Sequence, residues 1–355
     1  MVRQRNAPML DLGTVNTCMK KLGFGAVAPE SVRAYPGRRD KCSGITSDGR
    51  GVFVKRESPA GLERVRAVEG MHLPGLRRPL LLGTVEEEDI VVYELLEPAV
   101  AGDELVRESR FGPECARRVG EALASLHEAP LPQAYDDVSL DPGTLPFPPV
   151  EGLEALPVPW FAAASGAVLE LWRLIQRDAR VCEAVRGLRS RERSALRVPA
   201  HCDVRFDQFL FVDGAAYLVD WEEFRLADAA RDVGAFLGEW MYHALRTAHR
   251  AEPGEERSVG GAADVVAELR RVQPLVASFW LGYLAVRATD DPGLPRRATA
   301  FAGWHVLDRL LTDVATLPRL RTAHHTAFGF ARTTLVSSGD LAHLMGPEPA
   351  GAAHV

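Results

Sequence analysis

The sequence predicts an α+β protein with two lobes, a small β-rich lobe at the N-terminus and a larger, mainly helical lobe after it. The chain has 355 residues, 46% of them hydrophobic and 25% charged, which is enough for a large core and excludes a disordered or fibrous protein. Before residue 98 the apolar residues form short runs with turn signals between them. After residue 98 they recur at three- and four-residue spacing, which favours helices. We therefore expect one lobe over residues 1–98 and the other over residues 99–355.

The β-rich lobe is expected to contain several strands and one helix. Short apolar runs predict strands over residues 31–35, 51–55, 80–83 and 89–95. The turn Ser47-Asp48-Gly49 lies just before the second of these runs. A helix is predicted over residues 61–70, so the strands are interrupted once.

The second lobe is expected to be built from six helices. The helical spacing covers residues 112–127, 160–177, 231–245, 262–286, 297–316 and 319–336. A short β-rich island over residues 209–221 lies between the second and third of these helices. A Pro-rich connection over residues 131–159 is long for a compact domain, which is typical of a functional loop or of a mobile one. The order of a small β lobe, a helical lobe and a β island with acidic residues suggests a nucleotide-binding cleft between the lobes.

Charge and composition exclude several classes of partner. The formal net charge of −6 argues against a general nucleic-acid-binding protein, which needs a basic surface. The longest apolar stretches, such as residues 277–286, fall short of the ~20 residues that cross a bilayer, and the N-terminus has no secretory signal pattern. The five cysteines are scattered without a Cys-x-x-Cys pair, as is typical of reduced thiols. We expect a cytoplasmic protein that binds neither nucleic acid nor membrane.

The densest group of polar residues lies in mid-chain, over residues 199–232. His201 and Asp203 lie in a polar loop that leads into an apolar strand, and the Asp213-Gly214 turn returns the chain so that Asp220 ends a second apolar strand. Asp203, Gln208 and Asp220 are therefore expected to converge. Two carboxylates and an amide suit a divalent cation that bridges phosphates, with one carboxylate left to orient a hydroxyl nucleophile. The alternative is an ordinary hairpin with exposed acidic residues.

This segment resembles the catalytic and metal-binding motifs of the aminoglycoside phosphotransferase/choline kinase-like branch of the protein-kinase fold. The family motifs are His-Gly-Asp-Leu-x-x-x-Asn followed by Ile-Asp-Trp, and they match the residues from His201 to Gln208 and from Val219 to Trp221. Residues 123–127, which end in His127, and residues 228–233 resemble two further family elements. The resemblance covers roughly residues 31–245 and implies a bilobal protein-kinase-like fold and an ATP-dependent phosphotransferase that uses ATP and Mg²⁺.

The resemblance also implies roles for individual residues of the catalytic segment. Asp203 matches the catalytic aspartate, which accepts or orients the proton of the substrate hydroxyl, and Asp220 matches the aspartate that holds Mg²⁺ against the phosphates. Arg205 is where protein kinases carry a lysine that touches the transferred phosphoryl group. His201 is expected to support the loop. Asp232, at the start of an apolar helix, is expected to accept backbone N–H groups and to brace the loop.

Gln208 departs from the family pattern, which has Asn at this place. The additional methylene moves the amide oxygen by about a bond length, and Mg²⁺ tolerates little error at its ~2.1 Å ligand distance. Either the loop is shifted to suit Gln208, or a second metal site is weak, or catalysis is impaired.

The N-terminal lobe contributes candidates for binding the nucleotide. Lys55 is one of only four lysines among 42 basic residues, and a strand lysine in a cleft provides the compact charge that the α- and β-phosphates of ATP need. Glu63 on the next helix is its expected ion-pair partner, and Glu69 is a weaker candidate. The strand over residues 90–96, including Glu94 and Leu96, is expected to lead into the segment that receives adenine.

The stretch between the first two predicted strands resembles a loop that covers phosphates. Glycines there permit close approach of the backbone, although any hairpin could contain them. The candidate residues are Gly37, Arg38, Asp40, Ser43 and Gly44.

The acceptor is not determined by the fold. Residues 10–25, 30–40 and 52–55 resemble the kinase subunit of class V lanthipeptide synthetases and the related thioamitide-pathway kinases. In those systems the kinase phosphorylates Ser or Thr of a ribosomally made precursor peptide, and a separate HopA-like lyase eliminates the phosphate. The alternatives are a kinase for a small hydroxylated molecule, such as an aminoglycoside-like compound, and a nucleotide-binding scaffold without activity. The helices after residue 260 are expected to form the acceptor side.

Overall fold

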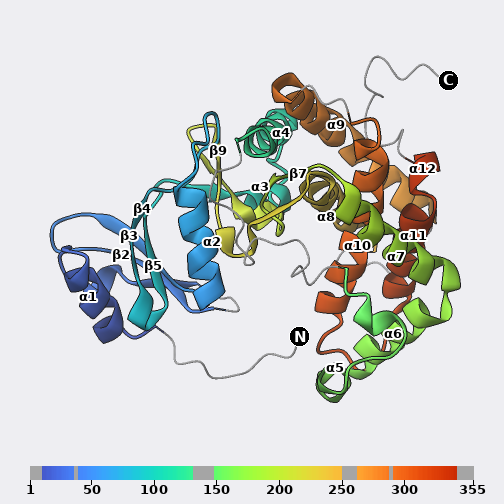
Figure 1. Cartoon of the computed structure of the whole chain (residues 1–355), viewed down its shortest axis with the longest axis horizontal. Coiled ribbons are helices and arrows are strands. Elements are labelled where there is room, and N and C mark those ends of the chain that lie inside the picture. Colours follow the sequence, from blue (N-terminus) through green and yellow to red (C-terminus); the bar gives the residue numbers. More distant parts are fainter. Residues whose placement is uncertain (1–9, 36–38, 131–147, 250–261, 288–290, 342–355) are drawn as a thin grey trace, which may run out of the picture.

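The computed structural model describes residues 10–35, 39–130, 148–249, 262–287 and 291–341. It has a β-sheet lobe at the N-terminus and a helical lobe at the C-terminus, with residues 197–228 between them (Figure 1). The predicted α+β class with two lobes is therefore confirmed. The division at residue 98 stays a prediction.

The N-terminal lobe is a five-stranded antiparallel sheet with the strand order β1-β2-β3-β5-β4. Alternate residues of β5 point to opposite faces, so Val92 packs with α1 while Val91 packs with α2 and the larger core. The strands are β1 Arg33–Tyr35, β2 Lys41–Ile45, β3 Gly51–Arg56, β4 Leu81–Val85 and β5 Ile90–Glu94, and the helices are α1 Leu12–Lys21 and α2 Pro59–Glu69. Helices α1 and α2 lie on opposite sides of the sheet (Figure 1), and Lys55 near the end of β3 contacts Asp220 of the C-terminal lobe.

Two elements of this lobe were not among the predicted ones. Helix α1 has a short apolar stripe, Val15, Cys18 and Met19, and begins at Asp11, whose side chain accepts a hydrogen bond from the Thr14 backbone N–H. Strand β2 contains Lys41 and Gly44, residue types that disfavour strands, and is held by its pairing with β1 and β3 on both sides.

The C-terminal lobe packs its long helices around an aromatic core. Helix α4 lies against α9, and α10 lies between α8 and α11. The α4–α9 contact is close because it places Gly120 against the backbone of Phe279. The helices are α3 Gly102–Arg107, α4 Pro113–His127, α5 Val158–Ala163, α6 Gly166–Arg177, α7 Ala179–Ser194, α8 Ala230–Ala248, α9 Ala262–Val286, α10 Leu294–Asp313, α11 Thr322–Val336 and α12 Ser338–Leu341.

The helices of this lobe differ from the prediction in several places, and the short helices α3 and α12 were not predicted. The helix expected over residues 160–177 is two helices, because Ser165 accepts the backbone N–H of Val168 and caps the start of α6. Helix α7 was not predicted, since arginines and other polar residues outnumber its apolar positions. Residues 131–147 of the Pro-rich connection lie outside the described residues.

Two small sheets flank the loop over residues 201–208. Strands β6 Val100–Ala101, β8 Phe209–Val212 and β9 Ala215–Leu218 form one, and β7 Arg197–Ala200 and β10 Arg225–Asp228 form the other. Asp213 and Gly214 both have positive φ, at 47° and 76°, as a tight β8–β9 hairpin requires. The hairpin register leads to a hydrogen bond of 3.0 Å from the Val219 N–H to the Gln208 carbonyl. Asp220, which follows the hairpin, therefore lies beside the loop that precedes the hairpin.

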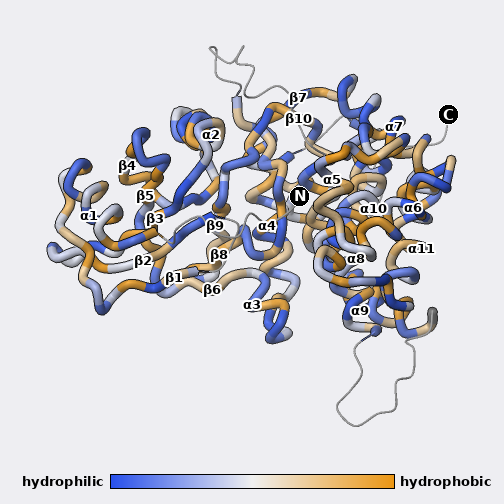
Figure 2. The backbone as a smooth tube through the Cα atoms, turned by 90° about the horizontal axis from the view of Figure 1, so that it is seen from below, coloured by the Kyte–Doolittle hydropathy of each residue, from blue (hydrophilic) through white to orange (hydrophobic). Residues whose placement is uncertain are grey.

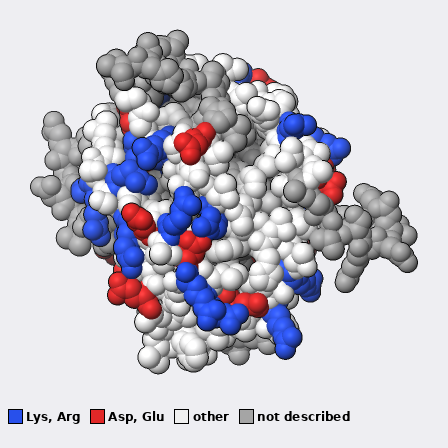
Figure 3. Space-filling model, turned by 90° about the vertical axis from the view of Figure 1, so that its right-hand side faces the viewer, with Lys and Arg blue, Asp and Glu red and all other residues white. Residues whose placement is uncertain are grey.

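Hydrophobic and hydrophilic residues alternate along the elements of both lobes (Figure 2), as expected for elements with one buried face. The end of the molecule formed by the C-terminal helices carries interspersed basic and acidic side chains (Figure 3). One ion pair of helix α7 joins Arg186 to Glu154 at 3.1 Å. Within the described ranges, no helix has both the length and the apolar character that crossing a membrane requires.

Candidate active site

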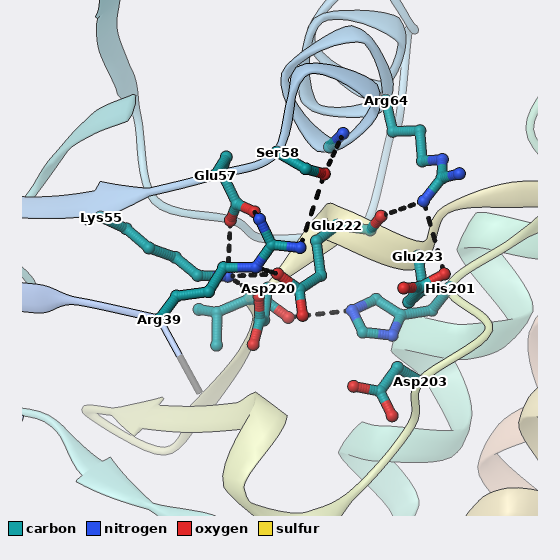
Figure 4. A network of polar contacts seen from close by, with 12 residues as sticks. Arg39, Lys55, Glu57, Ser58, Arg64, His201, Asp203, Asp220, Glu222 and Glu223 are labelled. Atoms are coloured by element: carbon teal, nitrogen blue, oxygen red, sulfur yellow. Dashed lines mark hydrogen bonds and ion pairs between the residues drawn. The ribbon is translucent and has the colours of Figure 1, made fainter. Parts of the chain in front are cut away.

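Three segments meet at the junction of the lobes. They are the end of β3 with Lys55, the loop between β7 and β8 with Asp203, and the short segment Trp221–Glu223 preceded by Asp220. Figure 4 shows Lys55 and Asp220 directed toward each other, with His201 and Asp203 on the side of the C-terminal lobe. Hydrogen bonds and ion pairs connect the N-terminal lobe to the C-terminal lobe at this point.

Asp232 holds the loop that carries Asp203. Its carboxylate accepts the backbone N–H groups of His201 at 2.6 Å and Cys202 at 2.8 Å. Cys202 has a positive φ of 66°, an unfavourable conformation that these bonds fix. Asp232 is fully buried, and burial alone would raise its pKa, but its hydrogen bond to His127, 3.1 Å away, and its other polar contacts lower it.

His201 is a buried support of the same loop. Its Nε2 lies 2.9 Å from the Val219 carbonyl, which fixes the ring beside the residue that precedes Asp220. Burial lowers the pKa of His201, with Asp232 opposing the shift. The imidazole is therefore neutral at neutral pH.

Asp203 remains partly accessible, with 29% of its side chain exposed. Burial raises the pKa of Asp203 to about 7, although the guanidinium of Arg205, 3.2 Å away, opposes this shift. Arg205 also contacts Asp207 at 3.1 Å. A carboxylate with a pKa near neutrality can accept a proton from a substrate hydroxyl, and the guanidinium beside it can meet negative charge.

Lys55 is buried among three carboxylates. Its Nζ forms an ion pair with Asp220, lies 2.5 Å from Glu57 and lies 3.1 Å from Glu222. Burial would lower the pKa of Lys55, but Asp220, Glu57 and Glu222 raise it well above its usual value, so the amine stays charged. The pKa of Asp220 is lowered because Lys55 outweighs the effect of burial.

Glu57 and Glu222 were not among the predicted site residues. Glu57 follows β3 and comes just before Ser58, the N-cap of α2, while Glu222 follows Asp220 by two positions. The spacing Lys-x-Glu at the end of a strand could have indicated Glu57, because residues two apart share a face of an extended segment. Glu222 lies in a helical turn after Asp220, which has a left-handed backbone, so no simple spacing indicated it. Burial beside a second carboxylate raises the pKa of Glu57 to about 7.

The site offers the oxygen donors that Mg²⁺ prefers. Ligand atoms of Glu57, Asp220 and Glu222 lie within 4.8 Å of one another. Gln208 is buried, and its backbone N–H donates to the Arg205 carbonyl at 3.1 Å. The carboxylates therefore fit a divalent cation. The backbone carbonyl of Gln208 accepts the N–H of Val219, the residue before Asp220, and Gln208 as a metal ligand stays a prediction.

The expected ion pair between Lys55 and Glu63 is wrong. Glu63 lies exposed on α2, and Lys55 pairs with Glu57 instead. The phase of α2 directs the next residue, Arg64, toward the site, where it donates to the Glu222 carbonyl at 2.6 Å and contacts Glu223 at 3.4 Å. Adjacent helix residues point about 100° apart, which separates Glu63 from Arg64. Glu69 pairs with Arg78.

The loop expected to cover phosphates is shorter than the sequence suggested. Ser43 and Gly44 belong to β2, and the Ser43 hydroxyl is buried, 3.0 Å from the Tyr35 hydroxyl. A Cβ on Gly44 would come within 2.4 Å of Val27, so this glycine serves close packing. Asp40 accepts the Arg56 backbone N–H at 2.9 Å through its own carbonyl. Gly37 and Arg38 lie outside the described residues.

The segment expected to receive adenine follows β5. The Glu94 side chain accepts the Leu80 backbone N–H at 2.8 Å, and the Leu95 N–H donates to the Gly51 carbonyl at 3.1 Å. Glu94 thus fixes the edge of the sheet, and Leu96 lies half-buried just beyond it. Adenine binding by Leu96 stays a prediction.

Comparison with known proteins places this geometry in context. The phosphotransferase enzyme family (APH) matches residues 62–275. Similar solved structures include an amicoumacin kinase in complex with AMP-PNP and Ca²⁺, with 13% identity, a TM-score of 0.55 and coverage of 90% of this chain and 92% of that one. An ethanolamine kinase from Plasmodium vivax has 14% identity, a TM-score of 0.57 and coverage of 95% and 92%. An ADP-bound aminoglycoside phosphotransferase has 10% identity, a TM-score of 0.50 and coverage of 93% and 99%. No functionally curated protein matches the sequence.

Proposed function

The chain belongs to the phosphotransferase enzyme family and is an ATP-dependent kinase, and from this premise we propose how its site transfers a phosphoryl group to a hydroxyl acceptor. The observation that carries the proposal is the meeting of Lys55 and Asp220 from opposite lobes, beside Asp203 and Arg205. This arrangement supplies a cation for phosphates, a metal ligand, a proton acceptor and a guanidinium for developing charge.

The catalytic step assigns one role to each side chain. The acceptor oxygen attacks the γ-phosphorus of ATP, the bond from this phosphorus to the β–γ bridging oxygen breaks, and Asp203 accepts the hydroxyl proton. ADP leaves with the bridging oxygen. Arg205 stabilises charge on the transferred group, and Lys55 binds the other phosphates. A Mg²⁺ ion held by Asp220 and its neighbours, with Gln208 as a further ligand, would neutralise phosphate charge.

The proposed acceptor is a serine or threonine of a ribosomally made precursor peptide. The support is the resemblance of residues 10–25, 30–40 and 52–55 to the kinase subunits of lanthipeptide and thioamitide systems. A HopA-like lyase would then consume the phosphorylated peptide. The chain would act in the cytoplasm, where precursor, ATP and Mg²⁺ are available.

A small hydroxylated molecule is the second candidate acceptor. It is favoured by the names of the similar structures, which include kinases for amicoumacin and ethanolamine. Those similarities support the fold, so the acceptor has to be decided by assay.

Intact-mass spectrometry separates these candidates. The purified chain is incubated with ATP and Mg²⁺ and either a Ser/Thr/Cys-rich precursor peptide encoded beside it or a panel of aminoglycosides and amino alcohols. The proposal expects mass increases of one phosphoryl group on the peptide. Phosphorylation of a small molecule alone would favour the second acceptor, and ATP binding without any product would favour a nucleotide-binding scaffold.

A further inference from the structure

We propose that Arg39 is a second phosphate-binding cation of the nucleotide site, acting beside Lys55. The inference rests on the proposed function, since it names a further residue for the same nucleotide. Arg39 was not among the residues expected from the sequence.

The sheet register brings Arg39 to the site. Lys41 in β2 pairs with Lys55 in β3, and the Arg56 N–H donates to the Asp40 carbonyl at 2.9 Å. Arg39 therefore lies just past the end of the paired strands, next to Glu57. Figure 4 shows its side chain directed inward over Lys55.

Among the described residues, the Arg39 guanidinium contacts Glu222, Glu57 and Ser58. Its Nε lies 2.8 Å from Glu222, one Nη lies 3.2 Å from Glu57, and the other lies 3.5 Å from the Ser58 hydroxyl. The side chain is 30% exposed, so it reaches inward from the surface without being fixed in the core. A guanidinium in this position presents several donors toward the space around Lys55.

Arg39 and Lys55 share the same two carboxylates, Glu57 and Glu222. A divalent cation on Asp220 and Glu222 would compete with both basic side chains for these oxygens. The phosphates that accompany the cation would then be the nearest anions for both side chains. Arginine suits this exchange because its planar fork binds phosphate oxygens through two parallel hydrogen bonds.

Among the described residues of the same hairpin, Ser43 was also suggested by the sequence as a phosphate contact. It is buried in β2 and bonded to Tyr35. The Arg39 side chain, in contrast, is directed into the site (Figure 4).

The test measures nucleotide binding without an acceptor. Calorimetric titration of the full chain with AMP-PNP and Mg²⁺ is compared with titration by adenosine. Arg39→Ala is expected to weaken AMP-PNP binding by about tenfold, which corresponds to the loss of one charge-assisted contact, and to leave adenosine binding unchanged. Arg39→Lys is expected to fall between the two because it keeps the charge but loses the fork. Arg33→Ala is the matched control, since Arg33 lies on the same hairpin, is exposed and contacts Glu97.

These outcomes distinguish a failure of the role of Arg39 from a failure of the proposed function. Wild-type affinity in Arg39→Ala would overturn the role of Arg39 while leaving the proposed function intact. Equal loss of AMP-PNP and adenosine binding would also overturn it, because it would indicate damage to the lobe. Failure of the wild-type chain to bind AMP-PNP would overturn both. If Arg39→Ala does not fold, the same comparison with Arg39→Gln decides the question.

Discussion

Asp203 combines partial exposure with a neighbouring guanidinium, and this combination determines its chemistry. The carboxylate can reach a substrate hydroxyl while Arg205 holds its orientation at 3.2 Å. Its environment differs from that of Asp232, which is fully enclosed and bonded to backbone N–H groups. On the proposed function, Asp203 in the loop accepts the proton, while Asp232 in α8 supports that loop through its backbone hydrogen bonds.

Replacing Asp203 by Asn should remove the proton acceptor and keep the shape of the side chain. We expect phosphotransfer to fall by about 10²- to 10⁴-fold, the usual contribution of a general base. The free energy of unfolding should change little, because the side chain is not in the core. Single-turnover phosphorylation and urea unfolding measure the two effects. Asp213→Asn, at the exposed hairpin turn, is the control, and full activity in Asp203→Asn would remove the residue from the mechanism.

The pKa of Asp203 also predicts a pH dependence. Only the ionised carboxylate accepts a proton, and burial raises its pKa to about 7, so the active fraction increases with pH. The value of kcat/KM should therefore rise between pH 5.5 and 8 and reach only about a tenth of its maximum at pH 6. A profile that is level over this range, measured with saturating Mg²⁺, would contradict the assignment.

Some of the site residues could be predicted from the sequence and others could not. Asp203, Asp220 and Lys55 follow from a motif and from the scarcity of lysine. Glu57 does not, because its role depends on the path of the chain after β3 and on the rotation of α2, which a single sequence leaves open. The same rotation exchanges Glu63 for Arg64 at the site.

At the scale of elements, the β8–β9 hairpin and the α4–α9 contact position the site from two sides. The hairpin aligns Asp220 with the preceding loop. Helix α4 ends at His127, which bonds to Asp232 and lies 2.8 Å from the hydroxyl of Tyr283 on α9. Packing of these helices therefore affects the loop that carries Asp203.

Gly120 tests this packing. A Cβ at this position would lie 2.1 Å from the Phe279 carbonyl oxygen, so Gly120→Ala should separate α4 from α9 and lower the free energy of unfolding by at least about 1–3 kcal/mol. Gly329→Ala in α11 is the control, because nothing lies within 4 Å of its added Cβ, and it should stabilise the chain by about 0.5–1 kcal/mol. Urea unfolding compares them, and shifts of equal sign would refute the packing argument.

The sequence predicted long helices well and short or polar elements poorly. Residues 262–286 match α9 because a long apolar pattern dominates its local preferences. Helix α7 and strand β2 depend on neighbours that are distant in the sequence, so local pattern could not identify them. The loop before β2 is shorter than predicted because β2 itself was not predicted.

At the scale of the whole molecule, the two lobes carry complementary charges where they meet. Lys55, Arg39 and Arg64 extend from the N-terminal lobe, and Asp220, Glu222 and Glu223 from the C-terminal lobe. The bilobal order could be predicted from the change in apolar spacing near residue 98. The charge pairing across the junction could not, because it requires the register of β3 and the rotation of α2.

The pairing across the junction has a consequence for how a nucleotide enters. On the proposed function, a metal–nucleotide complex enters a site whose basic and acidic side chains already form ion pairs with one another. The phosphates of the complex would replace the carboxylates that now contact Lys55 and Arg39. Its divalent cation would replace these two basic side chains on the carboxylates. We therefore expect nucleotide binding and the ion pairs between the lobes both to weaken as ionic strength rises.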